Sequence, residues 1–252
     1  SGRPPKASQA ALAVHGGQVA LLTKGASWGP WSVRRVRAAT AKEAAKALTQ
    51  AKPMATLTFA DSNYAGAGVL ALTAHGVLVA HRDREGGRTL LRVVSVTSKG
   101  ETAIVQRLPA VERAGWGASR LVSHGGGVAL LGLRRRGRRI DTVLRFLSAD
   151  GTKVRRTLVL ARGMAPAWPR LAPDGKGGLA CSFYDRRTDG DYAVYVDAQG
   201  RRGELRRLDD PALRASFGGP LLAPAKAPRQ WIALWPDPYT GHYALYRAQL
   251  QL

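Results

Sequence analysis

The sequence contains one cysteine, two methionines and few acidic residues. Its 252 residues include 17 Asp and Glu against 39 Lys and Arg, so the formal net charge is +22. The single Cys181 excludes an internal disulfide framework and a cysteine-rich zinc site. No run approaches the roughly 18 consecutive apolar residues that suggest a membrane-spanning helix. The apolar content of 45% is ordinary for a globular interior, which excludes wholesale disorder.

The scarcity of acids gives the surface a strong positive field, which attracts anions. We expect the partner to be an acidic protein, or an anionic polysaccharide or envelope surface. Nucleic acid is a further alternative, because Arg134–Arg139 contains five arginines in six residues. The basic residues form no single stripe, however, and no known nucleic-acid motif is present. No cofactor is expected.

Internal repeats with a period near 50 residues run through the chain. Gly190–Tyr195 (GDYAVY) and Gly241–Tyr246 (GHYALY) match at Gly, Tyr, Ala and Tyr, and they start 51 residues apart (241 − 190). A short apolar strand recurs upstream, starting at residues 19, 78, 128 and 179. Each copy divides into four short strands bounded by Gly, Asp and Pro. Four strands per period of about 50 residues are typical of a propeller blade.

We therefore predict an all-β fold, a single β-propeller domain over residues 1–252. Its five four-stranded blades are expected at about 10–39, 64–110, 116–162, 168–209 and 217–252. The fifth blade lacks a fourth strand, so either Ser1–Gln9 supplies it or the chain continues a larger propeller.

A helix is expected over residues 40–51, inserted between the first two blades. Thr40 and Glu43 have capping-box spacing, an Ala-rich stretch follows, and Pro53 ends the helix. Contact with a partner is one possible role, but a decorated loop is the commoner explanation for such an insertion.

The segment Leu179–Tyr195, which contains Tyr184-Asp185-Arg186 and then Gly190-Asp191-Tyr192, resembles repeats of extracytoplasmic bacterial β-propellers. These repeats are related to sialidase-like propellers. The resemblance implies the fold and an address in the periplasm, at the cell surface or outside the cell, but no particular activity. Ser148–Lys153 does not match the sialidase Asp box, because it lacks the Trp and is one residue short. The start Ser1–Lys6 is interpreted as a processed or artificial terminus from which any signal peptide has been removed.

Glycoside hydrolysis needs two or more carboxylates near the scissile bond. The predicted first strands of the blades contain no Asp or Glu: Ala11–Val14, Val69–Thr73, Ser119–Ser123, Arg170–Ala172 and Leu221–Ala223. Asp83, Asp185 and Asp237 each end a second strand, where turn capping is favoured over catalysis. We therefore expect no enzyme and no catalytic residue. A sugar-active hydrolase of sialidase-like or five-bladed glycosidase type is the alternative.

Two further residue groups were considered as metal ligands. Asp185, Asp189 and Asp191 could bind calcium, but their spacing fits an acidic hairpin tip better. His15, His75 and His124 occupy equivalent first turns, so turn formation is favoured over a metal ring. No metal site is predicted, and Cys181 is interpreted as a small buried hydrophobe.

The main expectation is a non-catalytic binding or scaffold protein. In a propeller, the connections into the first strands and the hairpins between second and third strands share one face. Aromatic and basic residues gather in these segments, where they could engage an anionic partner. The expected binding residues are Trp28, Trp31, Arg84, Trp116, Arg134, Arg135, Arg136, Arg138, Arg139, Trp168, Arg186, Arg187, Tyr239 and His242. Trp116 and Trp168 could instead pack between blades as core.

Overall fold

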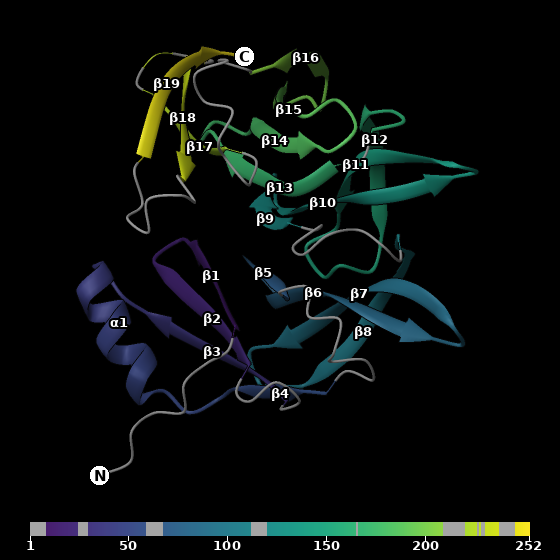
Figure 1. Ribbon diagram of the computed structural model, residues 1–252. Coiled ribbons are helices and arrows are strands. Elements are labelled where there is room, and N and C mark those ends of the chain that lie inside the picture. Colours follow the sequence, from purple (N-terminus) through teal and green to yellow (C-terminus); the bar gives the residue numbers. More distant parts are fainter. Residues whose placement is uncertain are drawn as a thin grey trace. The chain divides into compact units, whose positions relative to one another are not determined.

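The computed structural model describes residues 9–24, 30–58, 68–111, 120–164, 166–208, 220–225, 227, 230–236 and 245–252. These residues form four four-stranded sheets and one three-stranded sheet (Figure 1). Within each sheet, strands that are consecutive in the sequence are neighbours, so each sheet is a meander.

The bounds of the strands follow the predicted period. The first sheet has β1 (Gln9–His15), β2 (Gln18–Lys24), β3 (Trp31–Arg37) and β4 (Ala55–Leu57). The second has β5 (Val69–Thr73), β6 (Gly76–Glu85), β7 (Arg88–Thr97) and β8 (Thr102–Pro109). The third has β9 (Arg120–His124), β10 (Gly127–Arg136), β11 (Arg139–Leu147) and β12 (Val154–Ala161). The fourth has β13 (Pro166–Pro173), β14 (Leu179–Asp185), β15 (Gly190–Val196) and β16 (Arg202–Arg207), and the fifth has β17 (Leu221–Pro224), β18 (Gln230–Pro236) and β19 (Leu245–Gln251).

The predicted fold class, an all-β propeller with one short helix, is confirmed. The fifth blade has three strands among the described residues instead of four. The position predicted for the helix relative to the blades is wrong. The strand β4, which pairs with β3, follows the helix, so the helix lies within the first blade. With only three residues, β4 carries too short a pattern to recognise in the sequence. The prediction of a single domain over residues 1–252 stays a prediction.

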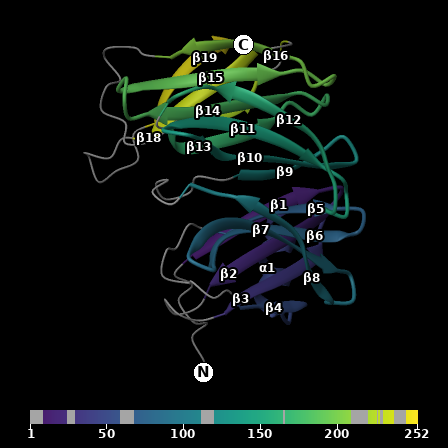
Figure 2. The same ribbon diagram turned by 90° about the vertical axis from the view of Figure 1, so that its right-hand side faces the viewer.

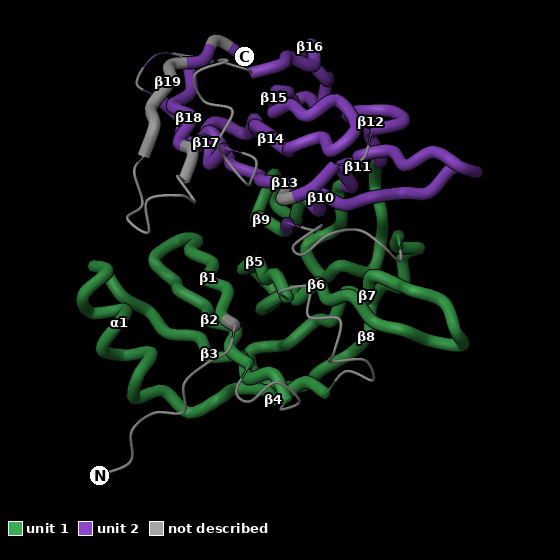
Figure 3. Tube along the Cα trace, in the orientation of Figure 1, with its two compact units in different colours: residues 1–112, 121–129, 146–156 green, residues 113–120, 130–145, 157–252 purple. Residues whose placement is uncertain are grey.

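The chain divides into two compact units (Figure 3). Unit 1 comprises residues 1–112, 121–129 and 146–156, and unit 2 comprises residues 113–120, 130–145 and 157–252. Each unit is described below by itself.

In unit 1, the first and second blades share an apolar core. Alternate residues of six strands supply it, as expected where one face of each sheet is buried. The cluster consists of Ala20, Leu22, Trp31, Val33, Ala55, Leu57, Leu70, Leu72, Val77, Val79, Val94 and Val96. Burial of these side chains removes enough apolar surface from water to fix the register of both sheets.

The helix α1 (Ala41–Gln50) covers the other face of the first blade (Figure 1). Its N-cap is the predicted capping box: the Glu43 N–H donates to Thr40 Oγ1 at 3.2 Å, and the Thr40 N–H donates to Glu43 Oε2 at 3.3 Å. Ala44 and Leu48, one helical turn apart, pack against Val19. The helix predicted at residues 40–51 is thereby confirmed, and it shields an apolar sheet face.

In unit 2, the fourth and fifth blades pack through small side chains and one tryptophan. This core consists of Ala180, Ala193, Leu222, Trp231 and Ala233. The neighbouring strands β13, β14 and β15 can be followed in Figure 2. Cys181 is fully buried, and burial raises the pKa of its thiol. No helix among the described residues has the length and apolar character needed to cross a membrane.

Candidate active site

The hairpin between β14 and β15, in unit 2, brings a phenol and two carboxylates together. Tyr184 lies directly opposite Asp191 in the strand pairing, and Asp185 lies opposite Gly190. Asp185 has no exposed surface. It accepts hydrogen bonds from the Thr188 hydroxyl at 2.7 Å, the Thr188 N–H at 3.2 Å and the Arg187 N–H at 3.4 Å. Asp185 therefore fixes the turn, and its neighbours carry the accessible chemistry.

Asp189 is held against Tyr184 in an uncommon backbone conformation. The Tyr184 hydroxyl donates to Asp189 Oδ1 at 2.5 Å. Asp189 has φ +48°, and no other non-glycine residue among those described has a positive φ. Such residues cluster at functional sites, where the surrounding structure compensates the strain. The hydrogen bond to Asp189, with burial and the charges of Asp189 and Asp191, raises the pKa of Tyr184 to about 12. The phenol therefore stays protonated and orients the Asp189 carboxylate.

Asp191 and Asp189 occupy different environments on either side of this phenol. Asp191 is 9% exposed, whereas Asp189 is exposed. The neighbouring Tyr192 stacks on Phe183 with ring centroids 5.9 Å apart, and its hydroxyl donates to Thr188 Oγ1 at 3.0 Å. Two carboxyl groups in contrasting surroundings are the pattern from which acid and base roles arise in enzymes. We call Tyr184, Asp189 and Asp191 the β14–β15 site.

Arginines lie in this hairpin and next to it. Arg207 Nη2 donates to the carbonyls of Thr188 at 3.4 Å and Asp189 at 3.5 Å. Arg187 Nη1 donates to the Gly163 carbonyl at 2.7 Å. A Cβ added at Gly163 would lie 3.8 Å from Cδ of Arg139, so the Arg139 side chain passes beside this glycine. The structure thus brings together two of the basic hairpins singled out in the sequence.

Two partly buried arginines add to the positive charge of unit 2. Arg120 in β9 and Arg170 in β13 occupy matching first strands. Burial, with a further contribution from the charge of Arg170, lowers the pKa of Arg120 to about 10. Burial also lowers the pKa of Arg170.

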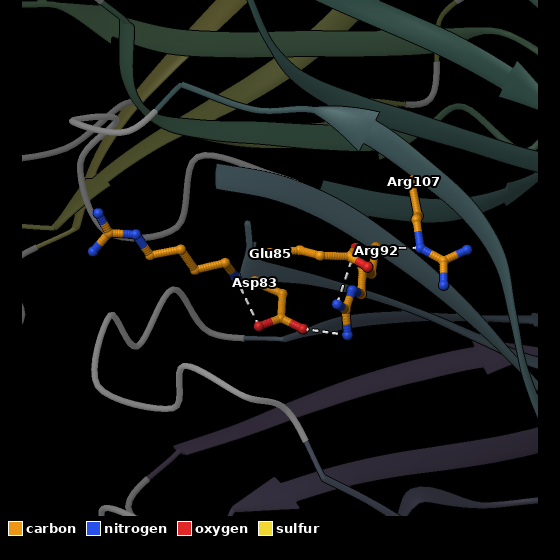
Figure 4. A network of polar contacts seen from close by, with 5 residues as sticks. Asp83, Glu85, Arg92 and Arg107 are labelled. Carbon is orange, nitrogen blue, oxygen red and sulfur yellow. Dashed lines mark hydrogen bonds and ion pairs between the residues drawn. The ribbon is translucent and has the colours of Figure 1, made fainter. Parts of the chain in front are cut away.

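A second carboxylate cluster, in unit 1, is arranged differently (Figure 4). Asp83 Oδ2 lies 2.6 Å from Arg92 Nη1, and Glu85 Oε2 lies 3.2 Å from Arg92 Nη2 and 3.3 Å from Arg107 Nε. The Asp83 side chain has no exposed surface, and its Oδ1 accepts the Arg84 N–H at 2.8 Å. We call these residues the β6–β7 ion network. Because its buried carboxylate is paired and out of reach of solvent, the network has a structural role, and removal of one partner would leave an unpaired buried charge.

Arg92 also lines a pocket of about 210 Å³ in unit 1. Its walls come from β4, β7 and β8 and include Thr56, Thr102 and Ile104. Neither Asp83 nor Glu85 lines it, so the pocket has no carboxylate for acid–base chemistry.

Trp31 is part of the core of unit 1. Its side chain is 1% exposed, and its ring lies 5.9 Å from that of His81, at a tilt of 57°. The Nζ of Lys24 lies 5.7 Å from the centroid of the Trp31 ring, and burial lowers the pKa of Lys24. The ring of Trp31 is therefore not available to a partner, contrary to its place among the expected binding residues.

The other expected binding residues divide into three groups. Arg84, Arg135, Arg136, Arg138, Arg139, Arg186 and Arg187 are exposed. Arg134 is partly buried and pairs with Asp141 at 3.2 Å. Trp28, Trp116, Tyr239 and His242 lie outside the described residues, as does the side chain of Trp168 in β13.

Metal-binding geometry is not found in the described part of the chain, where no group of three or more His, Cys, Asp or Glu is placed to hold an ion. The sequence interpretation considered Asp189 and Asp191 only as calcium ligands and did not connect them with Tyr184. The available signal was the hairpin itself, because strand pairing around a turn at residues 186–189 sets Tyr184 opposite Asp191.

The fold is shared with solved β-propeller structures of low sequence identity. The exo-β-1,3-galactanase of Phanerochaete chrysosporium matches with a TM-score of 0.56 and 8% identity, over 93% of this chain and 57% of that chain. The α-L-arabinofuranosidase of Lactobacillus brevis matches with a TM-score of 0.51 and 9% identity, over 96% and 90%. TolB of Acinetobacter baumannii matches with a TM-score of 0.50 and 9% identity, over 91% and 51%. The chain thus spans little more than half of the galactanase and TolB chains.

No protein-family model matches the sequence, and no curated protein sequence matches it. The class of this protein is defined by its fold alone, which is a β-propeller. Several of the matching propellers are described as glycoside hydrolases, so the shared fold gives no support to the expectation of a non-catalytic scaffold. The expectation of a non-catalytic scaffold protein, and of no enzyme, is corrected accordingly. It rested on the first strands, which contain no carboxylate in the described residues, and on the interpretation of the hairpin carboxylates as turn caps or an acidic hairpin tip.

Proposed function

We propose that this protein is a glycoside hydrolase whose carboxylate pair is Asp189 and Asp191. The carrying observation is the Tyr184–Asp189 hydrogen bond of 2.5 Å, made by a residue with φ +48°. The recurrence of the fold in sugar hydrolases supports the same reaction class, although fold alone assigns no activity.

The roles of the two carboxylates follow from their surroundings. We assign Asp191 as the proton donor to the glycosidic oxygen, because it is the more enclosed of the two carboxyl groups. Asp189 is exposed and oriented by Tyr184, so it takes the proton of the attacking water. The C–O bond to the leaving sugar breaks, a C–O bond to water forms, and one proton moves at each carboxyl group.

A polymeric substrate is consistent with an address outside the cytoplasm, where large polysaccharides occur. The matched hydrolases are named for galactan and for arabinofuranosides. The repeat resemblance of Leu179–Tyr195 implies the same address. We include an extracytoplasmic location in the proposal.

Release of reducing sugar from arabinan, β-1,3-galactan and a panel of chromogenic glycosides tests the proposal. Asp189→Asn and Asp191→Asn should each lower turnover about a hundredfold or more, the usual contribution of acid–base groups. Tyr184→Phe should lower it less, because it only releases the orientation of Asp189. Glu204→Gln is the matched control, since that side chain is 77% exposed and lies away from the hairpin on β16.

Circular dichroism and urea unfolding would establish that each variant is folded. Absence of turnover on the whole panel, or full activity of the folded Asp189→Asn and Asp191→Asn variants, would contradict the proposal.

A further inference from the structure

Two exposed arginines of unit 2, Arg139 and Arg187, meet at Gly163, and Arg187 belongs to the same turn as Asp189. Gly163 follows β12 and has φ +66°, a conformation that favours glycine. Its carbonyl accepts Nη1 of Arg187 at 2.7 Å, and Arg139 passes beside it. The β14–β15 hairpin, through Arg187, and the β10–β11 hairpin, through Arg139, therefore both contact this residue. We call Arg139 and Arg187 the Gly163 arginine pair.

The Gly163 arginine pair is free to bind an anion. Both side chains are exposed, and neither takes part in an ion pair within the described residues. Arg187 uses one of its five N–H donors on Gly163, and this hydrogen bond holds the guanidinium in place. A held guanidinium loses less conformational entropy on binding a carboxylate, which it can engage through two parallel hydrogen bonds.

The β10–β11 hairpin extends this positive surface. Arg135, Arg136 and Arg138 are exposed and, like Arg139, have no ion-pair partner among the described residues. Arg134 alone in this hairpin pairs with a carboxylate, that of Asp141. So many like charges repel one another, and a bound polyanion relieves that repulsion.

The mixture of charge signs on the β14–β15 hairpin argues for a sparse anion. Arg186 and Arg187 are followed within four residues by Asp189 and Asp191. Duplex DNA carries one negative charge per about 1.7 Å of its axis, so its phosphates would meet those carboxylates as well as the arginines. A uronic acid polymer has one carboxylate per sugar, which leaves its neutral glycosidic oxygen for the acid pair.

We infer that the substrate is an anionic, uronate-containing polysaccharide whose carboxylates bind the Gly163 arginine pair while the glycosidic bond lies at Asp189 and Asp191. This inference rests on the proposed hydrolase function and specifies its substrate class.

Binding of polygalacturonate tests the inference on an Asp189→Asn background, where cleavage is slow. Calorimetric affinity should fall as salt rises, because exposed charges are screened over about 8 Å at physiological ionic strength. Adding Arg139→Gln and Arg187→Gln should weaken binding about tenfold or more, the loss of two charge-assisted contacts.

A charge-matched control is available on α1. Lys42→Gln with Lys46→Gln, on the same Asp189→Asn background, lowers the formal charge by the same two units as the arginine pair, at two exposed positions of unit 1. This pair should change the affinity less than about twofold, because the residual long-range term is screened. Equal effects of the two pairs would overturn the inference.

Separate outcomes distinguish this inference from the proposed function. Cleavage of neutral arabinan without binding of polygalacturonate would overturn the inference and leave the hydrolase proposal intact. Arginine-dependent binding without cleavage of any polysaccharide would refute the hydrolase and, with it, the substrate role. Binding of a DNA duplex as tight as that of polygalacturonate, and equally reduced in the Arg139/Arg187 variant, would also overturn the inference.

Discussion

The second and fourth blades each have a buried aspartate near the end of the second strand, Asp83 in β6 and Asp185 in β14, and they satisfy its charge by different means. In the second blade, Arg92 pairs with Asp83 at 2.6 Å and with Glu85 at 3.2 Å. In the fourth blade, Asp185 accepts backbone and hydroxyl hydrogens from its own turn. In the second blade, the Arg92 guanidinium is thus occupied by contacts within the fold. The fourth blade leaves the side chains of Arg187 and Asp189 exposed in the same turn, where they are accessible to a ligand.

The largest expected effect is that of removing the guanidinium from the β6–β7 ion network. Arg92→Met leaves the Asp83 carboxylate buried without its partner, and the free energy of unfolding should fall by about 3–5 kcal/mol. Urea denaturation measures this loss. The double variant Asp83→Leu/Arg92→Met should recover much of it, because no unpaired charge remains. A loss below about 1 kcal/mol for Arg92→Met would mean that the buried pair does not carry the stability assigned to it.

The corresponding change in the fourth blade should cost less. Asp185→Ala removes the acceptor of three hydrogen bonds, but the freed Thr188 and Arg187 groups lie on an exposed turn and regain water. We expect a loss of about 2 kcal/mol in the same urea assay. Asp185→Asn, which keeps one acceptor oxygen, should retain part of it. If Asp185→Ala cost more than Arg92→Met, the comparison between the blades would be reversed.

The next prediction concerns the titration of Tyr184. A phenol whose folded pKa is about 12 against roughly 10 when unfolded binds more protons in the folded state between these values. Its contribution to stability is therefore complete below about pH 10 and is lost as the pH rises toward 12. Asp189→Asn should bring the pKa of Tyr184 back toward its usual value and flatten this loss.

Tyrosinate absorbance followed by alkaline titration measures the shift, with Tyr184→Phe to assign the signal. A titration that is the same in Asp189→Asn and in the unsubstituted protein would show that the short hydrogen bond does not exist in solution.

The smallest effect is expected at the exposed edge of the β6–β7 ion network. The side chains of Glu85 and Arg107 are 46% and 53% exposed, so Glu85→Gln should cost no more than about 1 kcal/mol. That cost should shrink further between about 0.05 M and about 0.5 M salt, whereas the cost of Arg92→Met should persist. Urea unfolding at both salt concentrations separates the two behaviours.

The fold could be predicted from the sequence because short local patterns of apolar and turn-forming residues mark each repeat. The apolar strands at 19, 78, 128 and 179 and the glycine turns set the blades, and Thr40 and Glu43 set the helix. The strand β4 was missed because three residues carry no periodicity. The helix α1 separates β3 from β4 in the sequence, so their pairing is a non-local contact that local patterns do not predict.

The site was less accessible to sequence reasoning. Trp31 was expected at the surface because it borders a hairpin, but its alternation with Val33 places it in the core. Tyr184 and Asp189 were not connected, because their contact depends on the left-handed backbone of Asp189. The first strands contain no acids in the described residues, and the hairpin carboxylates have the local pattern of turn caps, which does not reveal their contact with Tyr184.

The buried position of Cys181 has a practical consequence for following the hairpins in solution. Its thiol is fully enclosed and its pKa is raised, and the sequence has no other cysteine. Maleimide reagents, which require an accessible thiolate, should therefore leave the native protein unlabelled. A cysteine introduced at exposed Arg138 or Arg186 would take up one fluorophore at a known position, so energy transfer from a labelled oligosaccharide could report binding at each hairpin separately.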